Sequence, residues 1–182
     1  RDTYNAYSHA LTGLLRENAT QAVATHRITH LRYAVLSSAL NLAQDSDGDA
    51  RARALSNARE QARDMALAED SGWAYWAIAR AERQMGRRDR AQTLLRRAAL
   101  IAEKVEDQSA RNLLMKGIGD LSIEIGDTKF ASYQLLNMRL ADGRDHLAKK
   151  ILNATVEDPA TDGDIREILS AVLDAEDLQD AL

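Results

Sequence analysis

The sequence predicts an all-α protein built from helical repeats, and two observations carry this prediction. A pattern of small and apolar residues occurs twice with a spacing of 40 residues, around Gly86 and again around Gly126. Only 4% of the residues are aromatic and the chain has one proline, whereas alanine is abundant, which favours closely packed helices over strands. A unit of two helices around a glycine buries its apolar face by stacking on a neighbouring unit.

The first helices are predicted from apolar residues that recur every three or four positions. One runs over residues 4–16 and a second over residues 20–43. The polar stretch 45–49 ends the second helix, because Gly48 suits a left-handed C-terminal cap and Asp49 can cap the helix that follows.

The later helices are predicted between glycines and N-cap residues. They cover residues 50–67, 71–85, 89–106, 109–125, 127–141 and 142–156, with Ser71, Ser109 and Asp142 as N-caps. Pro159 interrupts the series, and residues 164–182 are expected to form one or two short helices.

The repeated residues resemble the tetratricopeptide repeat. In that family a large residue and a Leu-Gly pair precede a glycine at the hairpin, and Ala, Phe and Ala follow on the second helix. Residues at that spacing are Tyr75, Ile78, Ala79, Gly86, Ala91, Leu95 and Ala98, and again Met115, Ile118, Gly119, Gly126, Ala131, Leu135 and Met138. A weaker match surrounds Leu40, Gly48, Ala54 and Ala58, with one extra residue after the glycine.

Departures from the family pattern are also clear. The unit is about 40 residues long instead of the family's 34, the closing proline is absent, and the tyrosine position of the family holds Glu82 and Ser122. The resemblance implies a right-handed α-solenoid of stacked antiparallel helix hairpins with a repeat of 38–40 residues. We expect one domain over residues 1–182, in which residues 1–70 match loosely, residues 71–156 match best, and the acidic residues 160–182 cap the C-terminal end.

The resemblance also implies a function and a binding surface. In that family the first helix of each unit lines a concave groove that binds peptides, so the chain is expected to be a non-enzymatic scaffold for a protein or peptide. The corresponding positions are Trp73, Trp76, Arg80, Arg83 and Gln84, and then Leu113, Lys116, Asp120 and Ile123. Aromatic rings and guanidinium groups are good anchors, which favours an acidic or carboxylate-terminated segment as the ligand. Packing of Trp73 under the preceding helix is an equally good interpretation.

A metal-dependent enzyme is an alternative hypothesis, because His26 and His30 stand four residues apart on one predicted helix face. The glutamate that a zinc protease helix carries beside its first histidine is missing, since position 27 is Arg. Asp45, Asp47 and Asp49 lack the end residues of a calcium loop and are better explained as helix caps. The chain has no cysteine. We therefore predict no catalytic residue, no metal site and no cofactor.

Charge is unevenly distributed, although the net charge is only −4. Residues 73–104 hold eight basic and three acidic side chains, whereas residues 157–182 hold nine acidic side chains and one basic. A helical repeat that binds nucleic acid through the arginine-rich hairpin 80–97 is a second alternative, against which the acidic total argues. The acidic C-terminal residues could meet the arginine hairpin of another molecule, so a second copy of the chain is a further expected partner.

The sequence leaves the compartment open. No run of about 18 apolar residues occurs, so we expect no membrane span. The chain begins at Arg1 instead of Met, from which we expect that a tag, a signal peptide or another domain preceded it. Both a cytoplasmic and an exported protein fit this expectation.

Overall fold

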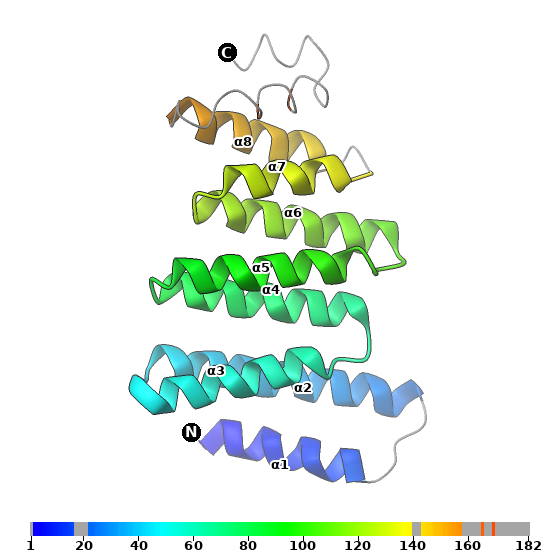
Figure 1. Cartoon of the computed structure of the whole chain (residues 1–182). Coiled ribbons are helices and arrows are strands. Elements are labelled where there is room, and N and C mark those ends of the chain that lie inside the picture. Colours follow the sequence, from blue (N-terminus) through cyan, green and yellow to red (C-terminus); the bar gives the residue numbers. More distant parts are fainter. Residues whose placement is uncertain (1, 17–21, 140–142, 158–164, 166–168, 170–182) are drawn as a thin grey trace. The chain divides into compact units, whose positions relative to one another are not determined.

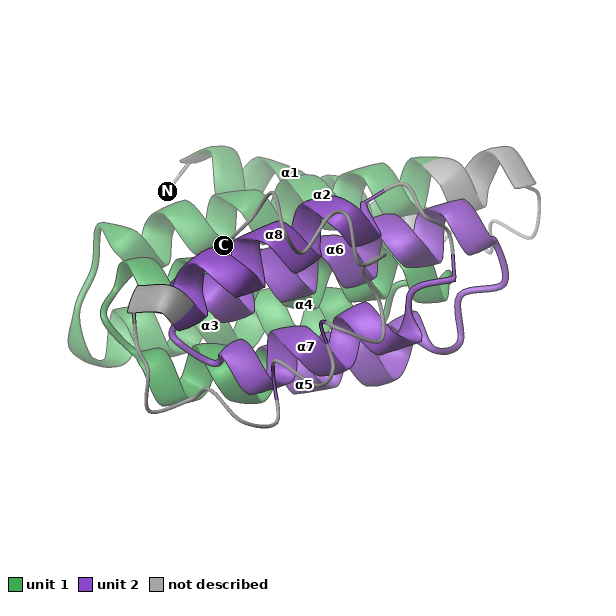
Figure 2. Cartoon of the chain, turned by 90° about the horizontal axis from the view of Figure 1, so that it is seen from above, with its two compact units in different colours: residues 1–94 green, residues 95–182 purple. Residues whose placement is uncertain are grey.

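The computed structural model of the 182-residue chain describes residues 2–16, 22–139, 143–157, 165 and 169. These residues form eight α-helices and no strand (Figure 1), which confirms the all-α fold class. The chain divides into two compact units, residues 1–94 and residues 95–182, coloured green and purple in Figure 2. Helix α5 (Arg88–Ala102) contains the boundary, and the two units are described one at a time below.

The first unit holds α1 (Asp2–Arg16), α2 (Ala22–Gln44), α3 (Gly48–Arg63), α4 (Ala68–Gln84) and the beginning of α5. Helix α2 packs against α1, α3 and α4, and α3 also packs against α4. Small residues of α2 and α4 are fully buried and let the helices approach closely. The core consists of Val35, Leu36, Ala39, Leu55, Ala58, Ala74, Ile78 and Ala79.

The second unit holds the end of α5 together with α6 (Gln108–Glu124), α7 (Thr128–Asn137) and α8 (Arg144–Glu157). Helix α6 packs against α7 and α8, and α7 packs against α8. Its buried side chains include Leu114, Met115, Ile118, Leu135, Leu147, Ile151, Ile165 and Leu169. Most of the expected C-terminal cap, residues 160–182, and the predicted N-cap Asp142 lie outside the described residues.

The helix bounds repeat with a spacing of 40 residues. Helices α2, α4 and α6 end at Gln44, Gln84 and Glu124, and α3, α5 and α7 begin at Gly48, Arg88 and Thr128. The helix bounds thus show a third repeat upstream of the two repeats that the sequence pattern matched well. Its register differs from the register expected for that unit, because Ser46 and not Gly48 stands at the position of Gly86 and Gly126.

Two of the three helix ends share one glycine motif. Gly86 and Gly126 have φ of 74° and 75°, the left-handed conformation that glycine adopts without strain. The Gly86 N–H donates to the Arg83 carbonyl and the Arg87 N–H donates to the Glu82 carbonyl, both at 2.8 Å. The same two bonds, again at 2.8 Å, close α6 around Gly126. This bond pattern is the Schellman motif, so the predicted glycine caps are confirmed at both positions.

Several predicted helix ends were wrong. Helix α4 begins at Ala68, and Ser71 is buried inside it, where its hydroxyl donates to the Ala62 carbonyl at 2.7 Å instead of capping the helix. Asp107 and not Ser109 caps α6, because its carboxylate accepts the Ala110 N–H at 2.7 Å. At the start of α3 the N-cap position is Asp47 and not Asp49.

Three helices also end four residues earlier than predicted. Helix α3 stops at Arg63 instead of residue 67. Helix α5 stops at Ala102. The Glu103 N–H still bonds four residues back, to the Ala99 carbonyl, but the Lys104 and Val105 N–H groups bond to carbonyls three residues back. Helix α7 stops at Asn137 because Met138 is extended, and the Arg139 N–H then donates to the Asn112 side chain at 3.2 Å.

Candidate functional site

Helix α4 presents three of the predicted binding residues on one side. The Arg80 guanidinium lies over the Trp76 ring, 5.6 Å from its centroid, within the range of a cation–π contact. The Trp73 ring meets the Trp76 ring edge to face, with centroids 5.5 Å apart. Trp76 is half-buried and Arg80 is exposed, so a ligand can reach both the ring and the charge.

A shallow groove of about 220 Å³ runs between α2 and α4 in the first unit. The buried and half-buried residues that line it are apolar and form its floor, whereas the exposed residues at its rim carry amide, hydroxyl and guanidinium groups. The lining residues are Ser37, Leu40, Asn41, Gln44, Trp76, Ala77, Arg80, Ala81 and Gln84. Across the groove, the Gln44 side-chain N–H donates to the Gln84 side-chain oxygen at 2.7 Å. These two glutamines are the last residues of α2 and α4.

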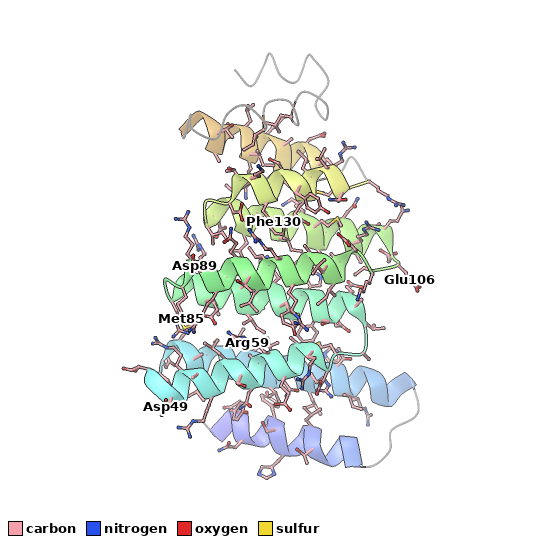
Figure 3. All side chains as sticks on the ribbon, in the orientation of Figure 1. Asp49, Arg59, Met85, Asp89, Glu106 and Phe130 are labelled. Atoms are coloured by element: carbon pink, nitrogen blue, oxygen red, sulfur yellow. The ribbon has the colours of Figure 1, made fainter. Side chains whose placement is uncertain are left out.

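A second open hollow, of about 500 Å³, continues past the two glutamines. It is lined by Gln44, Arg51, Gln84 and Met85, and Met85 is labelled in Figure 3 just after the end of α4. The Arg51 Nε donates to the Ala43 carbonyl at 3.0 Å, which holds the start of α3 against the end of α2. Because Gln44 and Gln84 line both hollows, the two adjoin at the ends of α2 and α4, and we call them together the track.

Polar contacts fix the helices that line this track. The Tyr33 hydroxyl of α2 donates to the Asp70 main-chain carbonyl at 3.0 Å and lies 3.2 Å from the Asp70 carboxylate in α4. Burial, and then the nearby Asp70 charge, raise the pKa of Tyr33 far above its ordinary value, so this hydroxyl stays protonated as a donor. Arg32, also in α2, connects this helix to α3, because its Nη1 donates to the side chain of Gln61 at 3.1 Å.

A fully buried carboxylate lies near the end of α4. The two oxygens of Glu82 accept from the Arg59 Nη2 at 2.9 Å and from the Arg87 Nη1 at 3.2 Å. Arg59, labelled in Figure 3, comes from α3, so this charge cluster ties α3 to α4 and to the turn that follows. Glu82, at the position that corresponds to the tyrosine of the tetratricopeptide repeat, is therefore the buried member of an ion cluster with two partly exposed arginines.

The predicted residues of the second unit form a different arrangement. Lys116 and Lys150 donate to the two oxygens of Asp120 at 2.8 and 2.9 Å, and the His146 Nε2 lies 4.0 Å from Asp120. Burial raises the pKa of Asp120, but hydrogen bonds from both lysines and their positive charges outweigh this effect and lower the pKa below its ordinary value. Lys116 and Asp120 thus bind each other within α6, and the bond from Lys150 to Asp120 links α8 to α6.

The structure brings together Trp76, Arg80 and Gln84, while Trp73 touches Trp76 without lining the groove. Arg83 is exposed and does not line the groove, and Leu113 is 60% exposed in the other unit. The α2 side of the groove was not predicted from the sequence; it is formed by Ser37, Leu40, Asn41 and Gln44. Alignment of the upstream repeat with a constant spacing of 40 residues would have predicted this side of the groove, since such an alignment places Gln44 at the position equivalent to Gln84.

The structure describes part of the two alternative sites, the histidine pair of a metal-dependent enzyme and the arginine hairpin of a nucleic-acid-binding repeat. The side chain of His26 lies outside the described residues, and His30 is exposed. Among the side chains that the structure describes, no three His, Asp or Glu residues gather closely enough to hold a metal ion. In the arginine hairpin, Arg87 binds buried Glu82, and Arg96 lies 5.9 Å from the Phe130 ring centroid and 3.9 Å from the Asp127 carboxylate.

Within the described helices, none combines the length and the apolar character needed to cross a membrane. Comparison with known proteins gave no relative: no family model matches the sequence, and neither a curated protein nor a solved structure matches it.

Proposed function

We propose that this chain is a protein-binding scaffold, similar in build to the tetratricopeptide repeat, that binds an acidic peptide segment along α2 and α4. In this proposal the helices form stacked antiparallel hairpins of an α-solenoid, and the first helices of consecutive hairpins line the binding surface. The 40-residue repetition of the helix bounds supports such a stack, because each unit buries its apolar face against the next.

The pairing of Arg80 with Trp76 in an open groove is the observation that carries the proposal. The ring offers apolar area at low entropic cost, and the guanidinium can grip a carboxylate through two parallel hydrogen bonds. Leu40 and Ala77 continue the apolar floor beside the ring. A ligand with a carboxylate next to an apolar side chain satisfies both features, and binding instead of catalysis accounts for the groove.

Selection from a random dodecapeptide library on the full chain tests the proposal. We expect the selected peptides to be rich in Asp and Glu and to change the fluorescence of Trp76. Trp76→Ala and Arg80→Glu should each weaken their binding by at least about thirtyfold, or about 2 kcal/mol. Arg53→Glu is the matched control, because Arg53 is exposed on α3 in the same unit and does not line the groove. Peptides that bind all these variants equally would refute the proposal.

A further inference from the structure

The geometry points to a more specific ligand: we infer that the groove holds a peptide in extended conformation and that Gln44 and Gln84 bind its main chain. This inference rests on the proposed function, which concerns the side chains of the ligand. It assigns a separate role to the two glutamines, which connect the two hollows along α2 and α4.

The hydrogen bond between the glutamines leaves one acceptor and one donor group for a ligand. A glutamine amide has one acceptor oxygen and an NH₂ donor. Because the Gln44 NH₂ donates to the Gln84 oxygen at 2.7 Å, the Gln44 oxygen and the Gln84 NH₂ are the two outer groups of the pair. One residue of an extended peptide offers the complementary set on one side of the chain, its N–H for the Gln44 oxygen and its carbonyl for the Gln84 NH₂.

Their mutual bond also prepares the glutamines for binding. Both side chains are exposed, so each would otherwise sample many rotamers and lose that freedom on contact with a ligand. Bonded to each other, they form a bridge from α2 to α4 whose outer groups are already oriented. Preorganisation of this kind lowers the entropic cost of binding.

The length of the track sets the size of the ligand. Met85 lies nine positions after Trp76, and at a rise of 1.5 Å per residue this separation is roughly 14 Å along the axis of α4. An extended peptide advances about 3.3 Å per residue, so about four to five residues fill this distance. In this arrangement the acidic residue lies at Arg80, the residue whose N–H and carbonyl are bonded lies over the glutamines, and a further side chain reaches the hollow beside Arg51 and Met85.

The test uses a peptide selected on the full chain, made in versions that carry one N-methyl group at each position in turn. N-methylation removes one main-chain N–H donor. We expect one internal position at which N-methylation weakens binding to the wild type by about tenfold, the loss of one hydrogen bond. Against Gln44→Met, the unmethylated peptide should bind about tenfold more weakly and N-methylation at that position should then cost little.

Further variants separate this inference from the proposed function. Gln84→Met should weaken binding by a similar factor, and the double variant should lose less than the product of the two single losses because the side chains act as a pair. Gln108→Met, at an exposed glutamine that begins α6, is the control and should bind like the wild type.

An N-methyl penalty that is the same in Gln44→Met as in the wild type would overturn the main-chain contact while leaving the Arg80 contact standing. Binding that depends on neither Trp76 nor Arg80 would overturn the proposed function and this inference with it.

Discussion

Replacement of Gly119 by alanine should destabilise the second unit, although alanine is the better helix former. Gly119 lies inside α6, opposite α8. A Cβ atom at this position would lie 2.6 and 2.8 Å from the two methyl carbons of Leu147 and 3.3 Å from its Cγ. Carbon atoms normally approach to about 3.5 to 4.0 Å, so Leu147 would have to move by about 1 Å. Leu147 is fully buried and packed on all sides, so this movement disturbs the core.

The magnitude follows from two opposing effects. Overpacking a core costs about 1 to 3 kcal/mol, whereas replacing a helical glycine by alanine gains up to about 1 kcal/mol. Because the clash is with a fully buried side chain, its cost lies in the upper part of this range, about 2 to 3 kcal/mol, and the free energy of unfolding should fall by about 1 to 2 kcal/mol. For a chain of this length that loss corresponds to a decrease in Tm of about 2 to 8 °C. Urea and thermal denaturation followed by far-UV circular dichroism measure both quantities.

Two variants test the cause of the effect. Gly13→Ala is the control, because Gly13 lies in α1 with no atom within 4 Å of the added Cβ, and the variant should be as stable as the wild type or more stable. In a Leu147→Ala background the contact is absent, so Gly119→Ala should cost nothing. A Gly119→Ala protein as stable as the wild type, or an equal loss in both backgrounds, would refute the close packing of α6 on α8.

Two further predictions concern buried and paired charges. Glu82→Ala should lower the free energy of unfolding by about 2 to 3 kcal/mol, because it removes a buried carboxylate that accepts from two arginines, and urea denaturation that gives an unchanged midpoint would contradict this role. Asp120→Asn should destabilise the chain at pH 7, and the difference from the wild type should shrink as the pH falls below about 4. The sign follows from the lowered pKa of Asp120 in the folded chain: the ionised carboxylate stabilises the fold above its unfolded pKa, and that contribution is lost as the pH falls through the folded pKa. A difference that stays constant from pH 7 to pH 3 would show that its pairing with the lysines does not stabilise the fold.

The sequence predicted the helices well because their apolar pattern is strong, but it predicted their ends poorly. Ser71 has a side chain suited to an N-cap, yet its hydroxyl donates to the Ala62 carbonyl of α3. This contact joins two helices and cannot be predicted from the residues next to Ser71 in the sequence. Likewise, α7 ends early and the next N–H bonds to Asn112, a residue 27 positions away along the chain. Tertiary contacts decide such ends, so they are visible only in the folded chain.

Only one side of the groove, the side on α4, was predicted from the sequence. Trp76, Arg80 and Gln84 follow from the family's spacing on α4, whereas the α2 side was not predicted because the upstream unit was aligned on Gly48. Gly48 does have a left-handed conformation, with φ of 52°, but it begins α3 instead of closing α2. A glycine marks a turn without indicating which of the two adjoining helices it belongs to, so the alignment on Gly48 placed the register of this unit wrongly.

Repeated and unrepeated positions have different roles in this chain. Ala39, Ala79 and Gly119 stand 40 residues apart and are all buried, because close helix packing needs a small residue in every unit. One position further along stand Leu40, Arg80 and Asp120, which differ in size and charge at equivalent places on α2, α4 and α6. The 40-residue period therefore predicts how the helices pack. The surfaces of α2, α4 and α6 differ only at positions where the residue type is not repeated. Arg80 lines an open groove while Asp120 is held by two lysines, so a candidate binding surface must be identified from side-chain contacts and not from the repeat.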